Sequence, residues 1–239
     1  MPFLLSAQMQ NEGTVRYLKT HNWAKMISKL DYMSKQTRER ILYQWANRSE
    51  WKQYCVLHFN QNETKYEDSE EKAEPDDEGG YSWRKDLYFV KRFFEQQKMV
   101  EGHEMLGKTY IVEDSLRGFN WKIQNDLKEV AGHICMKAVY EDTVRKHKIE
   151  AWFAQDIPIS AGPERFYGLP GLILEVVYNE DAIVLTADKI DYKKLTIELD
   201  EPKKLKGKRI KESDFTEVIK KHIADKTKAE EPWFWGVRY

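Results

Sequence analysis

The side chains best suited to chemistry in this sequence are its histidines, two cysteines and one carboxylate in an apolar run. The histidines occur one at a time, at positions 21, 58, 103, 133, 147 and 222. His133 would share one face of a strand with Cys135, two positions on, and both are metal-ligating residue types. Imidazole and thiolate suit zinc or copper, but two ligands do not make a site. We therefore expect a structural role for both residues and no bound metal.

The usual catalytic patterns do not occur in the sequence. There is no Gly-x-Ser-x-Gly elbow, phosphate-binding loop, His-Glu-x-x-His or Cys-x-x-Cys. We therefore expect no cofactor and a protein that is not an enzyme. A hydrolase whose catalytic residues are dispersed along the chain is the enzymatic alternative.

The carboxylate that stands out is Glu175, which interrupts the apolar run Leu172–Tyr178. The run is short and rich in β-branched residues, so it predicts a strand. Alternation places Leu172, Leu174, Val176 and Tyr178 on one face and Ile173, Glu175 and Val177 on the other. Glu175 then faces a ligand or partner, or else it faces solvent or pairs with a lysine. Carboxylates are seldom buried alone, which favours the second interpretation.

A turn is predicted immediately before this strand, across residues 169 to 172. Pro170 presets φ for the second position of a turn, and Gly171 tolerates the positive φ of the third. The sequence therefore predicts a type II turn that bends the chain sharply between two strands.

The segment that holds these features, Ala151–Val177, resembles the signature of the GLPGLI family of Bacteroidota proteins. Residues 168 to 173 spell the motif, and Ala151–Phe153 and Phe166 match positions upstream of it. Gly132–Ala138 and Asp114–Ile123 resemble two further stretches of that family. The resemblance implies an exported cell-envelope protein of a family without an established activity. The candidate binding residues in this block are Trp152, Phe166, Gly168, Leu169, Pro170, Gly171 and Glu175.

The first residues, Met1–Gln8, form a short apolar run like the end of a secretory signal with cleavage after Ala7. We interpret residues 1–7 as the remnant of a longer signal peptide and residues 8–239 as one β-rich domain. Together with the family resemblance, this places the protein in the periplasm or elsewhere in the exported envelope. An ordinary cytosolic N-terminus is the alternative.

Cys55 and Cys135 both lie in segments predicted to be strands. In an oxidising envelope they are candidates for a disulfide. A domain of this size does not need one, and two buried thiols are the alternative.

The composition supports one aromatic-rich β domain. The chain has 239 residues, of which 13% are aromatic and 33% charged, with eight tryptophans. This favours a sheet with an aromatic inner face and a charged outer face. A net charge of −1 lacks the basic footprint of a nucleic-acid-binding protein. No eighteen-residue apolar run occurs, so no transmembrane segment is expected.

Strand signals follow one another closely, with short polar connections, which indicates an antiparallel meander. The predicted fold class is mainly antiparallel β with flanking helices, as a curved sheet or half-barrel similar in outline to lipoprotein carriers. The predicted strands are Gly13–Lys19, Trp51–Phe59, Leu87–Phe94, Lys108–Glu113, Asn120–Ile123, His133–Tyr140, Lys148–Phe153, Leu172–Tyr178, Ala182–Ile190 and Leu195–Leu199.

Three other segments have their own character. Trp23–Asn47 has helical spacing and predicts one or two helices, and residues 213–228 predict an amphipathic helix capped by Ser213. Residues 60–80 are acidic with almost no apolar residue, which predicts a solvated loop rather than a calcium site. The tail, Pro232–Tyr239, has four aromatic residues and is expected to form a last strand or to cover a sheet edge.

A curved sheet with helices on one side would leave a concave aromatic face that suits acyl chains or an extended peptide. We expect a non-enzymatic envelope protein that holds a lipid, lipoprotein or peptide-like ligand on that face. The alternative is an interaction module whose loop, Ile157–Gly171, docks an outer-membrane transporter or assembly component. No nucleic-acid partner is expected.

Overall fold

The computed structural model describes residues 11–45, 50–73, 86–202 and 205–238. These residues form one sheet of twelve strands in the order β12-β6-β5-β4-β3-β2-β1-β11-β10-β9-β8-β7. Neighbouring strands are antiparallel, except that β12 runs parallel to β6. The strands are β1 (Gly13–Asn22), β2 (Glu50–Phe59), β3 (Glu63–Asp68), β4 (Tyr88–Phe93), β5 (Lys98–Met105), β6 (Lys108–Ser115), β7 (Lys122–Val130), β8 (His133–Asp142), β9 (His147–Ala154), β10 (Leu172–Tyr178), β11 (Ile183–Tyr192) and β12 (Lys208–Ile210).

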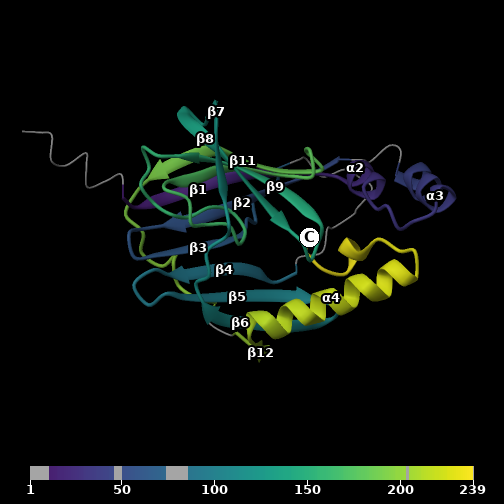
Figure 1. Ribbon diagram of the computed structural model, residues 1–239. Helices are drawn as coiled ribbons and strands as arrows, with labels where there is room; N and C mark the ends of the chain where they lie inside the picture. The colour runs from purple at the N-terminus through teal and green to yellow at the C-terminus, as the bar shows by residue number, and fades with distance from the viewer. Residues whose placement is uncertain (1–10, 46–49, 74–85, 203–204, 239) are drawn as a thin grey trace, which may run out of the picture.

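The sheet is open, with β7 and β12 at its two edges and no ladder between them in the described part of the chain. It bends so that α4 (Glu212–Lys228) runs along one side, and the C-terminal segment returns toward the middle of the molecule (Figure 1). The two short helices α2 (Trp23–Ser28) and α3 (Lys35–Trp45) lie together beyond the strand ends. The predicted antiparallel fold with flanking helices is confirmed. None of the helices within the described ranges is long and apolar enough to cross a bilayer.

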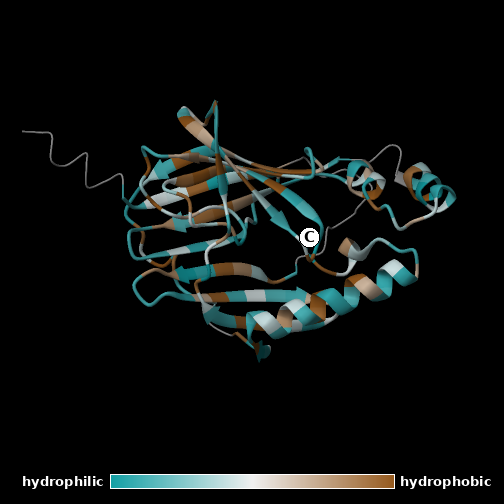
Figure 2. Cartoon of the chain, in the orientation of Figure 1, coloured by the Kyte–Doolittle hydropathy of each residue, from teal (hydrophilic) through white to brown (hydrophobic). Residues whose placement is uncertain are grey.

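Strand β1 shows how the sequence divides the two faces. Its alternate residues Val15, Tyr17, Lys19 and His21 are buried, while the residues between them are partly exposed. The inner row is therefore apolar at one end of the strand and carries polar and charged side chains at the other. Hydrophobic and hydrophilic residues alternate in the same way along many of the strands (Figure 2). The polar end of this inner row is where the candidate site lies.

The opposite, outer face carries a second, smaller apolar cluster. Phe89, Val100 and Ile111 pack there, with Leu205 against them. The segment after β11 covers part of this face, and the Lys91 ammonium donates to the carbonyl of Leu199. The predicted strand at Leu195–Leu199 is therefore wrong: the chain turns there, because its apolar residues serve as a cover and not as a ladder.

The prediction of one solvated loop over the acidic residues 60–80 is wrong for the first part of this range. Glu63–Asp68 is β3, which pairs with β2 and β4. Its alternate residues Thr64 and Tyr66 are buried, so two inward side chains outweigh the acidic composition. Residues 74–80 of that prediction lie outside the described residues, as do residues 1–7. The sequence also missed β5 and β12.

The C-terminal helix is α4, close to the predicted 213–228, but Ser213 does not cap it. Lys211 is the N-cap residue and makes no side-chain capping bond, while Glu212 and Asp214 lie in the first turn. The segment beyond the helix is neither a strand nor an edge cover. It forms a short 3₁₀ helix, Trp233–Trp235, whose Phe234 is buried.

Of the two alternatives for Cys55 and Cys135, the structure shows two free, buried thiols and not the candidate disulfide. Cys55 lies on β2 and Cys135 on β8, with β1, β11, β10 and β9 between them. Five strand spacings amount to roughly 24 Å, whereas bridged Cα atoms lie within about 7 Å. Burial raises the pKa of Cys55 to about 12 and that of Cys135 to about 11.

Candidate ligand-binding cavity

A cavity of about 740 Å³ lies on the inner face of the sheet, at the polar end of the β1 row. Strands β1 to β5, β8, β9 and β10 contribute to its wall, together with α4, the loop between β9 and β10, and the C-terminal segment. Ten of its described lining residues are Trp, Tyr or Phe, among them Trp23, Trp51, Tyr88, Phe166, Tyr178 and Phe234. The volume falls within the range of pockets that bind drug-sized ligands, about 300–1,000 Å³.

An ion cluster, which we call the Arg238 cluster, lies in the cavity wall and consists of Arg238, Asp68, Glu164, Lys19 and Tyr88. Arg238 donates from Nη1 and Nη2 to the two Asp68 oxygens at 2.8 and 2.7 Å, and from Nε and Nη2 to Glu164 at 3.1 and 2.9 Å. Its guanidinium carbon lies 3.5 Å from the ring centroid of Tyr88. The Lys19 ammonium is 3.5 Å from Asp68 and 3.7 Å from Glu164. The cluster thus places two cations between two carboxylates.

The electrostatics of this cluster keep both acids ionised. Burial alone would raise the pKa of Asp68 and Glu164, but Arg238 and Lys19 outweigh it and hold each pKa below its usual value. Glu164 is 3% exposed and has a φ of +55°, a conformation that non-glycine residues rarely adopt. The fold therefore accepts some backbone strain to bring this carboxylate into the cavity wall.

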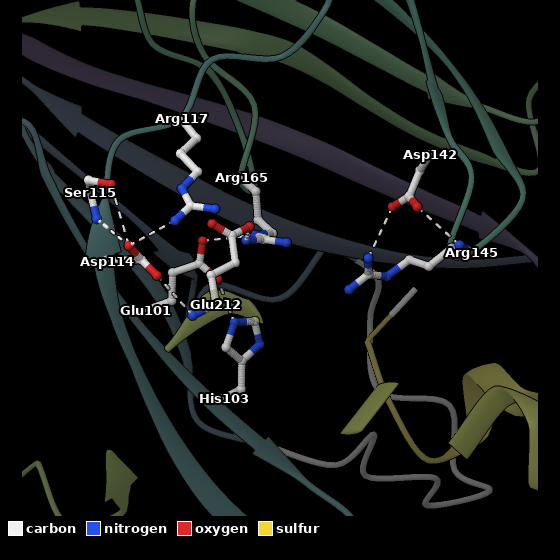
Figure 3. A network of polar contacts seen from close by, with 9 residues as sticks. All are labelled: Glu101, His103, Asp114, Ser115, Arg117, Asp142, Arg145, Arg165 and Glu212. Atoms are coloured by element: carbon white, nitrogen blue, oxygen red, sulfur yellow. Dashed lines mark hydrogen bonds and ion pairs between the residues drawn. The ribbon is translucent and has the colours of Figure 1, made fainter. Parts of the chain in front are cut away.

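A second group of charges surrounds Arg165 on the β5 side of the cavity (Figure 3). Arg165 donates from Nε to Glu101 at 2.9 Å and from Nη2 to Glu212 of α4. The His103 ring nitrogen Nε2 lies 2.7 Å from the other Glu101 oxygen. Burial would raise the pKa of Glu101, yet Arg165 and His103 lower it to about 2. This carboxyl is therefore ionised at neutral pH although it is completely buried.

Arg145, in the turn between β8 and β9, stands apart from that group in Figure 3. Its Nη1 donates to Asp142 at 3.0 Å, and Asp142 in turn accepts from the backbone N–H groups of Val144 and Arg145. These bonds fix the orientation of the guanidinium. The Arg145 Nε is buried and has no hydrogen-bond partner among the described residues.

The histidines that line the cavity are neutral at pH 7. Burial, helped by Arg145, lowers the pKa of His147 to about 4. Burial and the nearby Lys19 lower the pKa of His21 well below its usual value. Burial also lowers the pKa of His103, although Glu101 opposes the shift. These rings contribute apolar surface and hydrogen bonds, not charge.

The cavity wall combines aromatic side chains with charged groups. The described lining residues include no Ser, Thr or Cys, and the hydroxyl groups in the lining belong to Tyr88, Tyr140 and Tyr178. The pKa values of Asp68, Glu101 and Glu164 are lowered, so all three carboxylates are ionised at neutral pH. The wall offers aromatic faces between fixed, ionised groups.

The loop between β9 and β10 delivers Glu164, Arg165 and Phe166 to the cavity, and of the predicted binding residues only Phe166 lines it. The predicted type II turn is wrong. The Gly171 N–H donates to the Leu169 carbonyl at 2.9 Å, which closes a γ-turn around Pro170. Leu169 is buried beneath the loop, while Gly168 and Pro170 are exposed.

Gly171 is required by packing rather than by a ligand. A Cβ at this position would lie 2.2 Å from the Ala154 carbonyl oxygen. The loop is tied back by the N–H groups of Leu172 and Ile173, which donate to the carbonyls of Ile157 and Ala161. The motif is therefore a corner that fixes the loop, and through it the three cavity residues.

Trp152 and Glu175 lie on the face of the sheet turned away from the cavity. They are paired across β9 and β10, next to Ala151 and Val176, which point inward. Glu175 pairs with the Lys128 ammonium and accepts from Thr186 Oγ1 at 3.0 Å. A bulge between Ile173 and Glu175 interrupts the simple alternation predicted for this strand.

His133 and Cys135 make separate polar contacts in the structure. The His133 ring nitrogen Nδ1 lies 2.6 Å from the Asp156 carboxylate, and the Cys135 thiol donates to the His133 carbonyl. Within the described ranges, no group of three or more His, Cys, Asp or Glu side chains is placed to hold a metal ion.

Sequence reasoning missed Asp68, Glu164, Arg165 and Arg238, which carry four of the nine charges in the described cavity lining. A signal for part of the site was present in β1. Lys19 and His21 continue the inward alternation of Val15 and Tyr17, so they should have been recognised as buried polar residues.

Comparison with known proteins gives a short match to a family model and a similar fold. A family model described as "Protein of unknown function (Porph_ging)" matches residues 140–175, a short region that includes Arg145, the cavity-facing loop and the corner. No curated protein sequence matches the chain.

Two crystal structures of PNGF-II, in the P21 and C2 space groups, are similar in fold at 12% sequence identity, with TM-scores of 0.56 and 0.57. The match covers 87% and 86% of this chain and 32% of that chain, so the chain spans about a third of the length of PNGF-II. An uncharacterized conserved protein from Thermus thermophilus aligns over 86% of this chain and 93% of its own, at 7% identity and a TM-score of 0.39.

Proposed function

We propose that this protein is a non-catalytic, exported cell-envelope protein that binds a peptide-like ligand in the cavity on its concave face. The observation that carries the proposal is the cavity itself, whose aromatic walls alternate with ionised side chains that are fixed by hydrogen bonds. Preformed pockets of this size with a few oriented polar groups are the usual form of ligand sites.

Among the ligands expected from the sequence, a peptide fits these walls better than an acyl chain. A hydrocarbon chain would desolvate the charged side chains that line the cavity without giving them new partners, which costs free energy. A peptide supplies carbonyl and N–H groups for them, and its side chains can pack on the aromatic rings. A lipoprotein would fit only through its peptide part.

The exported location and membership of the GLPGLI family are part of the proposal. They are supported by the resemblance of Ala151–Val177 to that family and by the match of residues 140–175 to a family of unknown function. Docking of an outer-membrane component through the motif loop has less support, because Leu169 and Phe166 are buried there. The exposed residues of the loop are small or proline: Pro158, Ser160, Gly168 and Pro170.

Native mass spectrometry of the chain purified from its own envelope tests the proposal directly. We expect a bound peptide-like species that is released on denaturation. Calorimetric titration with short peptides and with fatty acids then ranks the two ligand classes. Retention of fatty acid in preference to every peptide would contradict the proposed ligand class.

A pair of variants locates the binding. Gln53→Trp places a large ring in the cavity wall and is expected to weaken ligand binding at least tenfold. Gln124→Trp adds the same ring on exposed β7 and should leave binding unchanged. Equal affinities of the two variants would place the ligand outside the cavity.

A further inference from the structure

The Arg238 guanidinium occupies a receptacle built from three separate parts of the fold. Asp68 comes from β3, Tyr88 from β4 and Glu164 from the loop between β9 and β10. A fork of donors on two carboxylates, with the guanidinium plane over an aromatic ring, is a geometry that selects arginine over lysine. We call these three residues the arginine receptacle.

The segment that delivers this arginine is itself a short peptide lying in the cavity. Residues 234–238 all line it, and Trp233, Phe234 and Val237 are buried. The segment pairs with no strand of the sheet in the described part of the chain. Side-chain contacts and single bonds, such as that between His222 Nε2 and the Trp233 carbonyl, hold it in place.

The charge of the cavity favours a cation. Its lining includes four basic residues, Lys19, Arg145, Arg165 and Arg238, against five acidic ones, Asp68, Asp86, Glu104, Asp142 and Glu164. Arg165 is further neutralised by Glu101 and Glu212 behind it. A wall of net negative charge with exposed aromatic faces attracts cationic groups more than anionic ones.

Resting on the proposed peptide-binding function, we infer that the C-terminal segment is an internal stand-in for the ligand. The arginine receptacle accepts an arginine side chain from an aromatic, basic peptide in trans, and Arg238 competes with it in cis. A competitor tethered in this way acts at an effective concentration in the millimolar range, so it lowers the apparent affinity for the external peptide.

The first test removes the arginine side chain from the full chain and supplies its head group in solution. In Arg238→Ala, N-ethylguanidinium at low millimolar concentration is expected to raise the Tm by several degrees. Ethylammonium, which has the charge without the planar fork, should act at least tenfold more weakly. The unmodified chain, whose receptacle is filled, should not respond.

Arg16→Ala is the matched control. Arg16 also lies between two carboxylates and over a tyrosine ring, but on the outer face and with more exposed partners. No rescue by N-ethylguanidinium is expected there. If Arg238→Ala does not fold alone, refolding in N-ethylguanidinium is the same measurement. A variant that neither gains Tm nor refolds with this cation overturns the inference.

The second test supplies the arginine on a peptide. A synthetic peptide with the sequence of residues 232–239 is compared with the same peptide carrying citrulline, a neutral isostere, in place of arginine. On Arg238→Ala, or on Arg238→Lys as a more conservative background, the arginine peptide should bind at least tenfold more tightly than the citrulline peptide. It should also bind these variants more tightly than the unmodified chain.

The outcomes separate the inference from the function on which it rests. Equal binding of both peptides, lost in Gln53→Trp, would uphold the peptide-binding cavity and overturn the arginine assignment. Rescue by N-ethylguanidinium without binding of any peptide would overturn both, and the receptacle would then be an internal ion pair only.

Discussion

Two arginines of this protein make nearly the same contacts on opposite faces of the sheet. Arg238 binds Asp68 and Glu164 over the ring of Tyr88 on the inner face. On the outer face, Arg16 donates to Asp188 at 3.1 and 2.7 Å and to Glu71 at 2.7 Å, with its guanidinium carbon 4.2 Å from the centroid of the Tyr54 ring. A tally of contacts would rank the two clusters as equals.

Their surroundings make them different. The Glu164 side chain is 4% exposed and that of Asp68 23%, whereas those of Glu71 and Asp188 are 53% and 31% exposed. Water solvates the outer carboxylates whether or not the arginine is present. The inner carboxylates lose most of that solvation on folding, so they depend on their partner. The free-energy cost of removing either arginine therefore depends on how far its carboxylate partners are buried.

Removal of each arginine is expected to give the largest difference in stability between the two clusters. Arg238→Ala leaves Asp68 and Glu164 with Lys19 as their cation, and we expect it to lower the free energy of unfolding by about 3–5 kcal/mol. Arg16→Ala should cost about 0–1 kcal/mol. Urea unfolding of both variants measures the difference, and similar losses would mean that burial does not separate the clusters.

Acid should act on the inner face through Glu101. The folded-state pKa of Glu101 is about 2, below its usual 4.5, so its contribution is present above pH 4.5 and is lost as the pH falls toward 2. The expected loss is on the order of 3 kcal/mol. His147, with a pKa of about 4, acts in the same direction between about pH 6.5 and 4.

Unfolding free energies measured from pH 7 down to 2.5 check this expectation. Glu101→Gln should be less stable at neutral pH but should lose less on acidification. Arg16→Ala should follow the pH profile of the unmodified chain. A profile that is flat below pH 4.5 would contradict a strongly ionised Glu101.

Substitution of Gly171 tests whether a change at the corner, outside the cavity, affects the residues on the inner face. A Cβ there would overlap the Ala154 carbonyl, so Gly171→Ala is expected to cost on the order of 2 kcal/mol and to shift the loop that holds Glu164. Gly118→Ala, where a Cβ meets no atom within 4 Å, should change stability by less than about 0.5 kcal/mol. Thermal unfolding measures the Tm of both variants. Equal Tm values would show that the corner is not constrained by packing.

Glu175 provides an intermediate case on the outer face. It is 9% exposed, but the Lys128 side chain that pairs with it is 33% exposed. We expect Glu175→Gln to cost about 1 kcal/mol, between the two arginine variants. A double-mutant cycle with Lys128→Met isolates the pair. A loss as large as that for Arg238→Ala would show that exposure of the partner does not matter.

Strand periodicity was enough to predict the fold, yet it failed where charged residues point inward. β3 was taken as a loop because its acids dominate the composition, and β5 was missed although Glu101 and His103 are buried on it. Both strands carry parts of the site. Polar side chains on an inner face look, in sequence, like those of a solvated segment.

The rest of the site depends on contacts that no local pattern encodes. Asp68 and Arg238 are 170 positions apart and meet only because the C-terminal segment folds back onto β3. The sequence signature pointed to the loop and its corner, whereas Trp152 and Glu175 proved to lie on the other face. A motif that is prominent in sequence can mark a constraint of packing and still lie next to the functional surface.

The close approach of Gly171 to Ala154 separates architecture from specificity in this chain. The motif at residues 168 to 173 is constrained by packing alone, whereas residues 164 to 166, a few positions earlier, would contact a ligand in the cavity. A related chain can therefore retain the corner unchanged and exchange Glu164 or Arg165 for other side chains. In such a chain the motif would predict the fold, whereas residues 164 to 166 would decide which ligand the cavity binds.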